Sequence, residues 1–74
     1  MFVLSQNKEI LGTFKKFTVE RNLGGGKEAK FAILGYSEGT ANVLGVYAEK
    51  KFAVAELEKI LSALLDNKTA YMVE

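Results

Sequence analysis

The sequence contains neither cysteine nor histidine, and these two absences exclude several classes of protein. Without cysteine the chain can form no disulfide. Without either residue a structural zinc site is close to excluded, because such sites are built from cysteine and histidine. Small domains bury only about 60% of their unfolded surface and commonly rely on a disulfide, a metal or a second subunit. For this chain of 74 residues, oligomerisation is the stabilising device that remains.

Groups suited to catalysis are also sparse. Histidine, the commonest general acid or base, is missing, and Asp66 is the only aspartate. Glu49, Glu56 and Glu58 are expected on or near the solvent side of a helix, and no carboxylate cluster has the spacing of a calcium loop. The serines have no base near them in the sequence, which leaves only serine–lysine arrangements formed by the fold. We therefore expect a protein that is not an enzyme and that uses no cofactor and no metal ion.

Long apolar runs are absent as well. No run is long enough to span a bilayer, and the apolar start of the chain is followed at once by polar residues, without a basic start or a signal-peptide core. We expect a cytoplasmic protein without membrane contact. Hydrophobic residues make up 49% of the chain and charged residues 26%, as in an ordinary globular domain, so a single domain over residues 1–74 is predicted.

The most regular pattern covers residues 49–66 and predicts an amphipathic helix. At 100° per residue its aliphatic side chains occupy one sector centred on Leu57. Asn67 is expected to close the helix, because asparagine tolerates the left-handed conformation. Phe52 projects away from this sector, and it either packs on a neighbouring strand or loop or is an exposed anchor for a partner. The residues expected to face the core are Ala53, Val54, Leu57, Ile60, Leu61, Leu64 and Leu65.

Short β-prone segments precede and follow this helix. Asn7 lies in a turn that predicts a first hairpin, and Phe17 and Val19 form the apolar side of an alternating strand. The predicted strands are residues 2–5, 9–11, 13–20, 29–36, 41–47 and 69–73. Together they predict an α+β fold: a small antiparallel sheet of about five strands, made of β-hairpins, packed on one amphipathic helix and followed by a short C-terminal strand.

The second hairpin is expected to turn at Glu38 and Gly39. This register pairs Tyr36 with Ala41, Leu34 with Val43, Ala32 with Gly45 and Lys30 with Tyr47 on one face, and Phe31 with Val46 and Ile33 with Leu44 on the other. The second of these faces is assigned to the helix. The first is too apolar for water, so either a second subunit covers it or the first hairpin curls over it, and a register shift of one residue would exchange the two faces. The candidate interface comprises Leu34, Tyr36, Val43, Tyr47 and Phe52.

Positive charge gathers between residues 13 and 30, where five cations face Glu20 and Glu28. Such an excess is modest for a nucleic-acid surface and is more typical of a solvated edge. The glycines at 24–26 favour a mobile loop tip over a phosphate cradle, because a strand rather than a helix follows them. The candidate nucleic-acid contacts are Lys15, Lys16, Arg21, Lys27 and Lys30.

The predicted elements follow one another in the order β-β-β-β-β-α-β. Three short motifs accompany this order: the opening Phe2-Val3-Leu4-Ser5-Gln6-Asn7, the hairpin end Leu44-Gly45-Val46-Tyr47 and the helix residues Ala55, Leu57, Ile60 and Leu61. In this the chain resembles a family of short uncharacterised proteins from Gram-positive bacteria and their prophages and mobile elements, although the glycines at 24–26 depart from that pattern. The resemblance implies a bacterial cytoplasmic setting and no assigned activity. We expect a small protein-interaction module that forms a homodimer or binds an unidentified protein, with weak nucleic-acid binding as the alternative.

Overall fold

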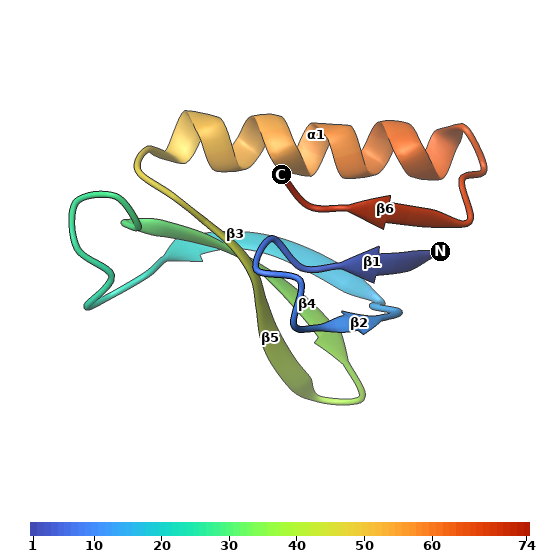
Figure 1. Ribbon diagram of the computed structural model, residues 1–74, viewed down its shortest axis with the longest axis horizontal. Helices are drawn as coiled ribbons and strands as arrows, with labels where there is room; N and C mark the ends of the chain where they lie inside the picture. The colour runs from blue at the N-terminus through green and yellow to red at the C-terminus, as the bar shows by residue number, and fades with distance from the viewer.

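The computed structural model describes residues 1–74 as six strands and one helix (Figure 1). The α+β fold, with a single helix followed by a short strand, is confirmed. The strands divide between two three-stranded sheets, where one sheet was expected. The elements are β1 (Phe2–Leu4), β2 (Leu11–Gly12), β3 (Lys16–Arg21), β4 (Phe31–Ser37), β5 (Thr40–Tyr47), α1 (Lys50–Leu65) and β6 (Ala70–Met72).

The small sheet has the strand order β2-β1-β6, and the large sheet has the order β3-β4-β5. β1 pairs antiparallel with β2, as the first predicted hairpin requires, and parallel with β6, which returns beside it after α1. Both edges of β1 are therefore hydrogen-bonded within the small sheet, and β1 cannot extend the large sheet. Pairing between the two ends of the chain is thus the reason that a single sheet does not form.

The turn of the first hairpin differs from the prediction in one detail. Lys8 has the positive φ, at 66°, and Asn7 does not. The Asn7 side chain instead accepts hydrogen bonds from the Ser5 hydroxyl at 2.6 Å and from the Glu9 N–H at 3.0 Å. Asn7 therefore stabilises the turn through its side chain, in the manner of an Asx-turn.

The second hairpin turns at Glu38 and Gly39 as predicted, with φ of 50° and 82°. Tyr36 pairs with Ala41 and Leu34 with Val43, so the predicted register is confirmed next to the turn. A bulge then places Leu44 as an extra residue in β5, and beyond it the predicted register is wrong by one residue. The observed pairs there are Ile33 with Gly45, Ala32 with Val46 and Phe31 with Tyr47.

This bulge moves Tyr47 to the face that α1 covers. Phe31 and Ile33 lie on that face, and Tyr47 is now the partner of Phe31. Its ring packs against the core, whereas the predicted register placed Tyr47 on the opposite face with Leu34 and Val43. A β-bulge reverses the sheet face to which each later residue of the strand points. One inserted residue is therefore sufficient to move Tyr47 from one face of the sheet to the other.

The helix lies across all three strands of the large sheet. Its inward side chains are Ala53, Glu56, Ile60 and Ala63. The predicted helix is confirmed, but its core-facing sector is rotated by about 80° from the predicted one at 100° per residue. Two physical reasons account for the rotation. The alanines allow close approach to the sheet, and Glu56 is held inward by hydrogen bonds to the C-terminal segment.

The C-terminal end of α1 closes as predicted at Asn67, which has a φ of 56°. The Asn67 N–H donates to the carbonyl of Leu64, and the Lys68 N–H donates to that of Ala63. These two bonds form a Schellman motif, which satisfies carbonyls that the helix would otherwise leave unpaired. The chain is thereby directed back along the helix into β6 (Figure 1).

One core joins the two sheets and the helix. Ile33 and Leu44 come from the large sheet, Val3 from the small sheet, and Ala53 and Ile60 from α1, and all five are buried. Gln6 also connects the sheets along the edge of β5. Its backbone N–H donates to the carbonyl of Leu44, while its side chain accepts from the N–H of Val46 and donates to the carbonyl of the same residue.

Candidate functional site

The fold brings together three of the five predicted interface residues and separates the other two, Tyr47 and Phe52. Leu34, Tyr36 and Val43 lie on the face of the large sheet away from α1, whereas Tyr47 lies on the other face. Tyr36 is engaged within the chain, because its hydroxyl donates to Glu20 at 2.8 Å and Lys16 lies 4.5 Å from the centre of its ring. The hydrogen bond from Tyr36, with a second from Thr18, lowers the pKa of the Glu20 carboxyl. Charged side chains of β3 therefore flank this face.

Phe52 is half exposed and remains apart from the core. Lys51 lies over its ring, with the ammonium nitrogen 5.4 Å from the ring centre. This exposure is compatible with an anchor for a partner, and that role stays a prediction. Phe52 stands alone at the start of α1, because Ala55 and Lys59, its neighbours along the helix, are a small and a charged residue.

The predicted nucleic-acid contacts are not gathered on one surface, and Lys27 is exposed outside both of the hollows that the other four line. Arg21 and Lys30 line a polar cleft of about 520 Å³ beside the glycine loop, whereas Lys15 and Lys16 line a separate apolar groove. A strand, β4, follows the glycines as predicted, but the N-terminus of α1 also lies beside them. Lys50, the first residue of α1, lines the same cleft, and the fold brings it there from a distant part of the sequence.

The apolar groove lies between α1 and residues 13–17, the segment that leads into β3. It has a volume of about 430 Å³. Most of its wall is hydrophobic, and Lys15 and Lys16 lie at its border together with Thr13. The hydrophobic residues that line the groove are Met1, Phe14, Phe17, Leu57, Ile60, Leu61 and Leu64.

The exposed side of α1 continues this groove. Val54, Leu57, Leu61 and Leu64 follow one another at spacings of three, four and three residues, and we call them the outer stripe. Val54, Leu61 and Leu64 are exposed, and Leu57 is partly buried. The spacing is that of the contact positions in a helix pair, because side chains three and four residues apart share one helix face. Leu65, at the end of α1, is also exposed.

The outer stripe lies one residue after the buried row Ala53, Glu56, Ile60 and Ala63, which has the same spacing. The helix therefore directs two alanines, a carboxylate and one large aliphatic residue, Ile60, toward the sheet and leaves most of its leucines outside. The sequence pattern showed these leucines, but predicted them in the core. Periodicity alone cannot distinguish a core-facing row from a partner-facing row when both are apolar.

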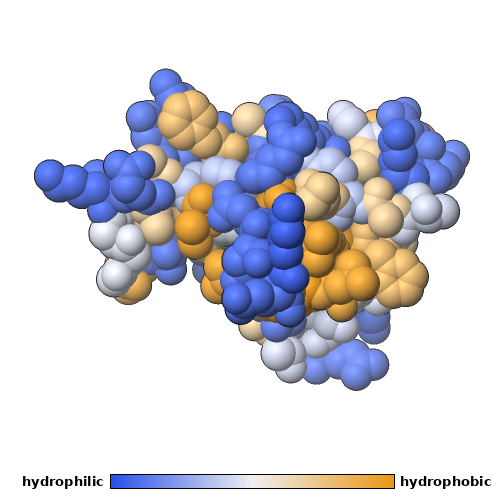
Figure 2. Space-filling view, viewed as in Figure 1, coloured by the Kyte–Doolittle hydropathy of each residue, from blue (hydrophilic) through white to orange (hydrophobic).

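A second apolar surface covers the outer face of the small sheet, where Figure 2 shows hydrophobic side chains gathered over β1 and β2. Phe2, Leu4, Leu11 and Met72 contribute to it, and all except Leu4 are exposed. A hollow of about 360 Å³ there is lined only by hydrophobic residues. Strands β1, β2 and β6 have two or three residues each, so the surface is short.

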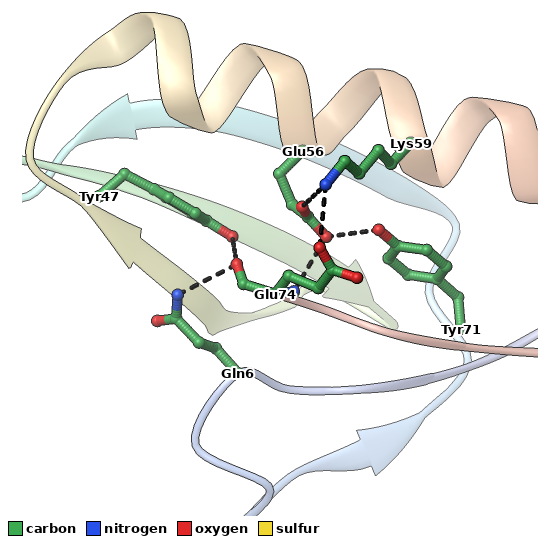
Figure 3. A network of polar contacts seen from close by, with 6 residues as sticks. All are labelled: Gln6, Tyr47, Glu56, Lys59, Tyr71 and Glu74. Carbon is green, nitrogen blue, oxygen red and sulfur yellow. Dashed lines mark hydrogen bonds and ion pairs between the residues drawn. The ribbon is translucent and has the colours of Figure 1, made fainter.

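A buried carboxylate, Glu56, organises the main polar network of the protein (Figure 3). Only 3% of Glu56 is exposed. Its Oε2 atom accepts hydrogen bonds from the Tyr71 hydroxyl at 2.6 Å and from the Glu74 N–H at 3.0 Å, while Oε1 lies 3.9 Å from the ammonium of Lys59. The carboxylate is thus satisfied by Tyr71 of β6, by Glu74 in the C-terminal segment that follows β6 and by Lys59 of α1 itself, as a buried charge must be.

The same segment is held from its other side. The carbonyl of Glu74 accepts a hydrogen bond from the Tyr47 hydroxyl at 2.8 Å and one from the Gln6 side chain at 3.2 Å. The Glu74 carboxylate pairs with Lys59 at 2.9 Å. Every polar group of Glu56 and of the two tyrosines is therefore used inside the fold, and the network fastens β6 and Val73 against α1.

This network predicts a loss of stability at alkaline pH. Burial, followed by the nearby carboxylates Glu56 and Glu74, raises the pKa of the Tyr47 hydroxyl; burial and the hydrogen bond to Glu56 raise that of Tyr71. The hydrogen bond to Glu74 likewise raises the pKa of Lys59. Unfolded tyrosine loses its proton near pH 10 while the folded groups keep theirs, so stability is fully present below about pH 10 and falls above it.

Chemical denaturation between pH 8 and 11.5 tests this expectation. Each tyrosine contributes at most about 1.4 kcal/mol per pH unit to the decline, and partial exposure reduces that figure. The double substitution Tyr47→Phe with Tyr71→Phe will lower the stability at pH 8 and flatten the decline above pH 10. An equal slope in both proteins would show that these hydroxyls do not cause it.

Comparisons with protein-family models, with curated proteins and with solved structures found no match for this chain. The resemblance to short proteins of Gram-positive bacteria and their prophages therefore stays a prediction. α1 is the only helix, and it lacks the length and the apolar character needed to cross a membrane.

Proposed function

We propose that this protein is a non-enzymatic protein-interaction module whose docking surface is the outer stripe together with the apolar groove. One observation carries the proposal. α1 keeps Val54, Leu61 and Leu64 on its surface, whereas Ile60 is the only large aliphatic residue in its buried row. Exposed apolar surface of this extent, contiguous with a hollow, is characteristic of protein-binding sites and is uncommon on isolated small proteins.

The energetics of the stripe set a requirement on the partner. A fully buried aliphatic side chain contributes about 1.5–3 kcal/mol, so each half-exposed stripe residue offers about 1 kcal/mol to a partner that covers it. Association costs about 4–15 kcal/mol in lost freedom of motion. The stripe alone therefore supports only weak binding, and a stable partner must also contact the neighbouring groove or the strand beside it.

The proposal that the protein is not an enzyme is supported by the state of its titratable groups. Glu56 is the one buried carboxylate, and its oxygens are engaged by Tyr71, Glu74 and Lys59. A general base must reach a substrate proton within hydrogen-bond distance, and these partners occupy the positions from which Glu56 could do so. The apolar groove presents no carboxylate, because Thr13, Lys15 and Lys16 are its only polar residues.

Binding of nucleic acid is less well supported than binding of protein. Lys15 and Lys16 lie beside the groove, and Lys16 is engaged by the ring of Tyr36. Arg21 and Lys30 lie in the polar cleft, where the guanidinium carbon of Arg21 is 5.5 Å from the centre of the Phe31 ring. A strong phosphate-binding surface concentrates its cations on one face, whereas here they are divided.

A photo-crosslinking experiment tests the proposed docking surface. A benzophenone amino acid is placed at Leu61, in the middle of the outer stripe, and at Ser62 as a matched control that is exposed on the adjacent side of α1. We expect a protein adduct of defined mass from position 61 and little from position 62. The identified partner, once purified, should bind the wild type and should not bind Leu64→Lys.

The result is decisive in both directions. Equal adduct yields at positions 61 and 62, or an adduct that persists in Leu64→Lys, would show that the outer stripe is not a docking surface. Leu64 is nearly half exposed, so its substitution by lysine is expected to change the stability of the isolated chain by no more than about 0.5 kcal/mol. Loss of the adduct in this variant then reports on binding and not on folding.

A further inference from the structure

We propose that the occupant of this surface is a second copy of the chain, joined edge to edge through β3 so that the two large sheets form one sheet of six strands. The inference rests on the proposed function and specifies its partner. β3 is an edge strand of the large sheet, and it begins at the apolar groove that the outer stripe borders. The strand edge and the stripe therefore lie on the same side of the molecule.

The outer edge of β3 offers unpaired backbone groups. The N–H of Asn22 donates to the carbonyl of Lys30, which fixes the alternation of hydrogen-bonded pairs along the ladder between β3 and β4. In an antiparallel ladder every second residue bonds to the neighbouring strand. The backbone groups of Phe17, Val19 and Arg21 accordingly point away from β4. An edge of this kind is a template for another strand.

β3 is complementary to a second β3 in one antiparallel register. When Thr18 lies opposite Thr18 of the second copy, Lys16 lies opposite Glu20 and Phe17 opposite Val19. Phe17 and Val19 are residues whose backbone groups point outward, so this register also forms the hydrogen-bonded pairs. Lys16 and Glu20 lie on the sheet face away from α1, and the dimer contains their opposite-charge pair twice.

The helices support the same arrangement. A two-fold axis at Thr18 places the two α1 helices antiparallel, with their outer stripes turned toward one another. α1 has no acidic residue in its first turn and no basic residue in its last turn, and its N-terminal Lys50 and Lys51 oppose its own dipole. In an antiparallel pair these lysines approach the negative end of the neighbouring helix. The dimer thus gives these charges a favourable partner.

A disulfide experiment tests the register directly. The chain has no cysteine, so Thr18→Cys introduces a single thiol. Facing residues of a non-hydrogen-bonded antiparallel pair have Cα atoms about 4.5 Å apart, which lies within the range of about 4.4–6.8 Å that a disulfide requires. We expect Cys substituted at Thr18 to form a covalent dimer under mild oxidation. The same substitution at exposed Thr40 in the turn of the second hairpin should not.

Charge reversal provides an independent measurement that does not depend on cysteine chemistry. Sedimentation of the purified chain over a concentration series gives the dimer dissociation constant. Lys16→Glu should raise that constant about tenfold, because two opposite-charge pairs become like-charge pairs. Combining Lys16→Glu with Glu20→Lys should restore it. Leu61→Lys should abolish the dimer, since it places charges where the two stripes meet.

The outcomes separate this inference from the proposed function. Two results would overturn the strand-paired dimer. The first is a purified chain that remains monomeric. The second is a dimer that is lost in Leu61→Lys but is insensitive to the charge reversals and is not linked at position 18. In either case the photo-adduct from position 61 still decides the docking surface. Linkage at position 18, together with restoration by the double reversal, establishes the six-stranded arrangement.

Discussion

Glu56→Ala will lower the free energy of unfolding by about 2–4 kcal/mol, because it leaves the Tyr71 hydroxyl and the Glu74 N–H without their acceptor. The total stability of a domain of this size is expected to be about 4–11 kcal/mol, so the loss is a large fraction of it. Alanine is the better helix former at this position, and the loss must therefore arise from the hydrogen bonds. Urea denaturation followed by circular dichroism measures it.

Two further variants identify the cause. Glu56→Gln can keep both hydrogen bonds, since Oε2 accepts the two of them and an amide oxygen can replace it, so we expect a loss of only about 1 kcal/mol. Glu58→Ala removes an exposed carboxylate two residues away, on the opposite side of the helix, and should change the stability by less than about 0.5 kcal/mol. A loss in Glu56→Gln equal to that in Glu56→Ala would show that charge, and not hydrogen bonding, is what the fold requires.

The features that the sequence predicted correctly are those that local chemistry determines. The Glu38 and Gly39 turn follows from the left-handed backbone that a two-residue hairpin needs, and the end of α1 follows from the same property of Asn67. The alternation of Phe17 and Val19 correctly gave the inner face of β3. In each case the deciding residues lie within a few positions of one another, so the printed sequence contains the necessary information.

The features that the sequence did not predict depend on residues that are distant along the chain. The parallel pairing of β1 with β6 joins the two ends of the sequence, and Gln6 recognises Val46 across forty positions. The bulge at Leu44 has only one weak marker in the sequence, the neighbouring Gly45, yet it decides on which face Tyr47 lies. Glu56 was predicted on or near the solvent side of the helix, because a charged residue in a helix is ordinarily solvent-exposed. Its burial is explained only by donors that come from β6 and from the residue at the C-terminal end, Tyr71 and Glu74.

Prediction and structure differ most in which side of α1 faces the core. The exposed fractions of two adjacent residues show this difference. Ile60 is 1% exposed and Leu61 is 54% exposed, although the sequence pattern predicts both in the core. Ile60→Ala should cost about 2–5 kcal/mol of unfolding free energy, because it leaves a cavity among Val3, Ile33 and Ala53. Leu61→Ala should cost only about 1 kcal/mol in the isolated chain, because the fold covers about half of the Leu61 side chain.

The measurement is urea denaturation at several protein concentrations, since binding of a second copy would add a concentration-dependent contribution to stability. At the lowest concentration Leu61→Ala should lose only about 1 kcal/mol, and this loss should grow with concentration, while the larger loss in Ile60→Ala should be present throughout. Equal losses at positions 60 and 61 at low concentration would place Leu61 in the core. A leucine whose removal costs more when a partner is present is an interface residue. The test therefore shows whether one apolar face of α1 serves folding and the other serves binding.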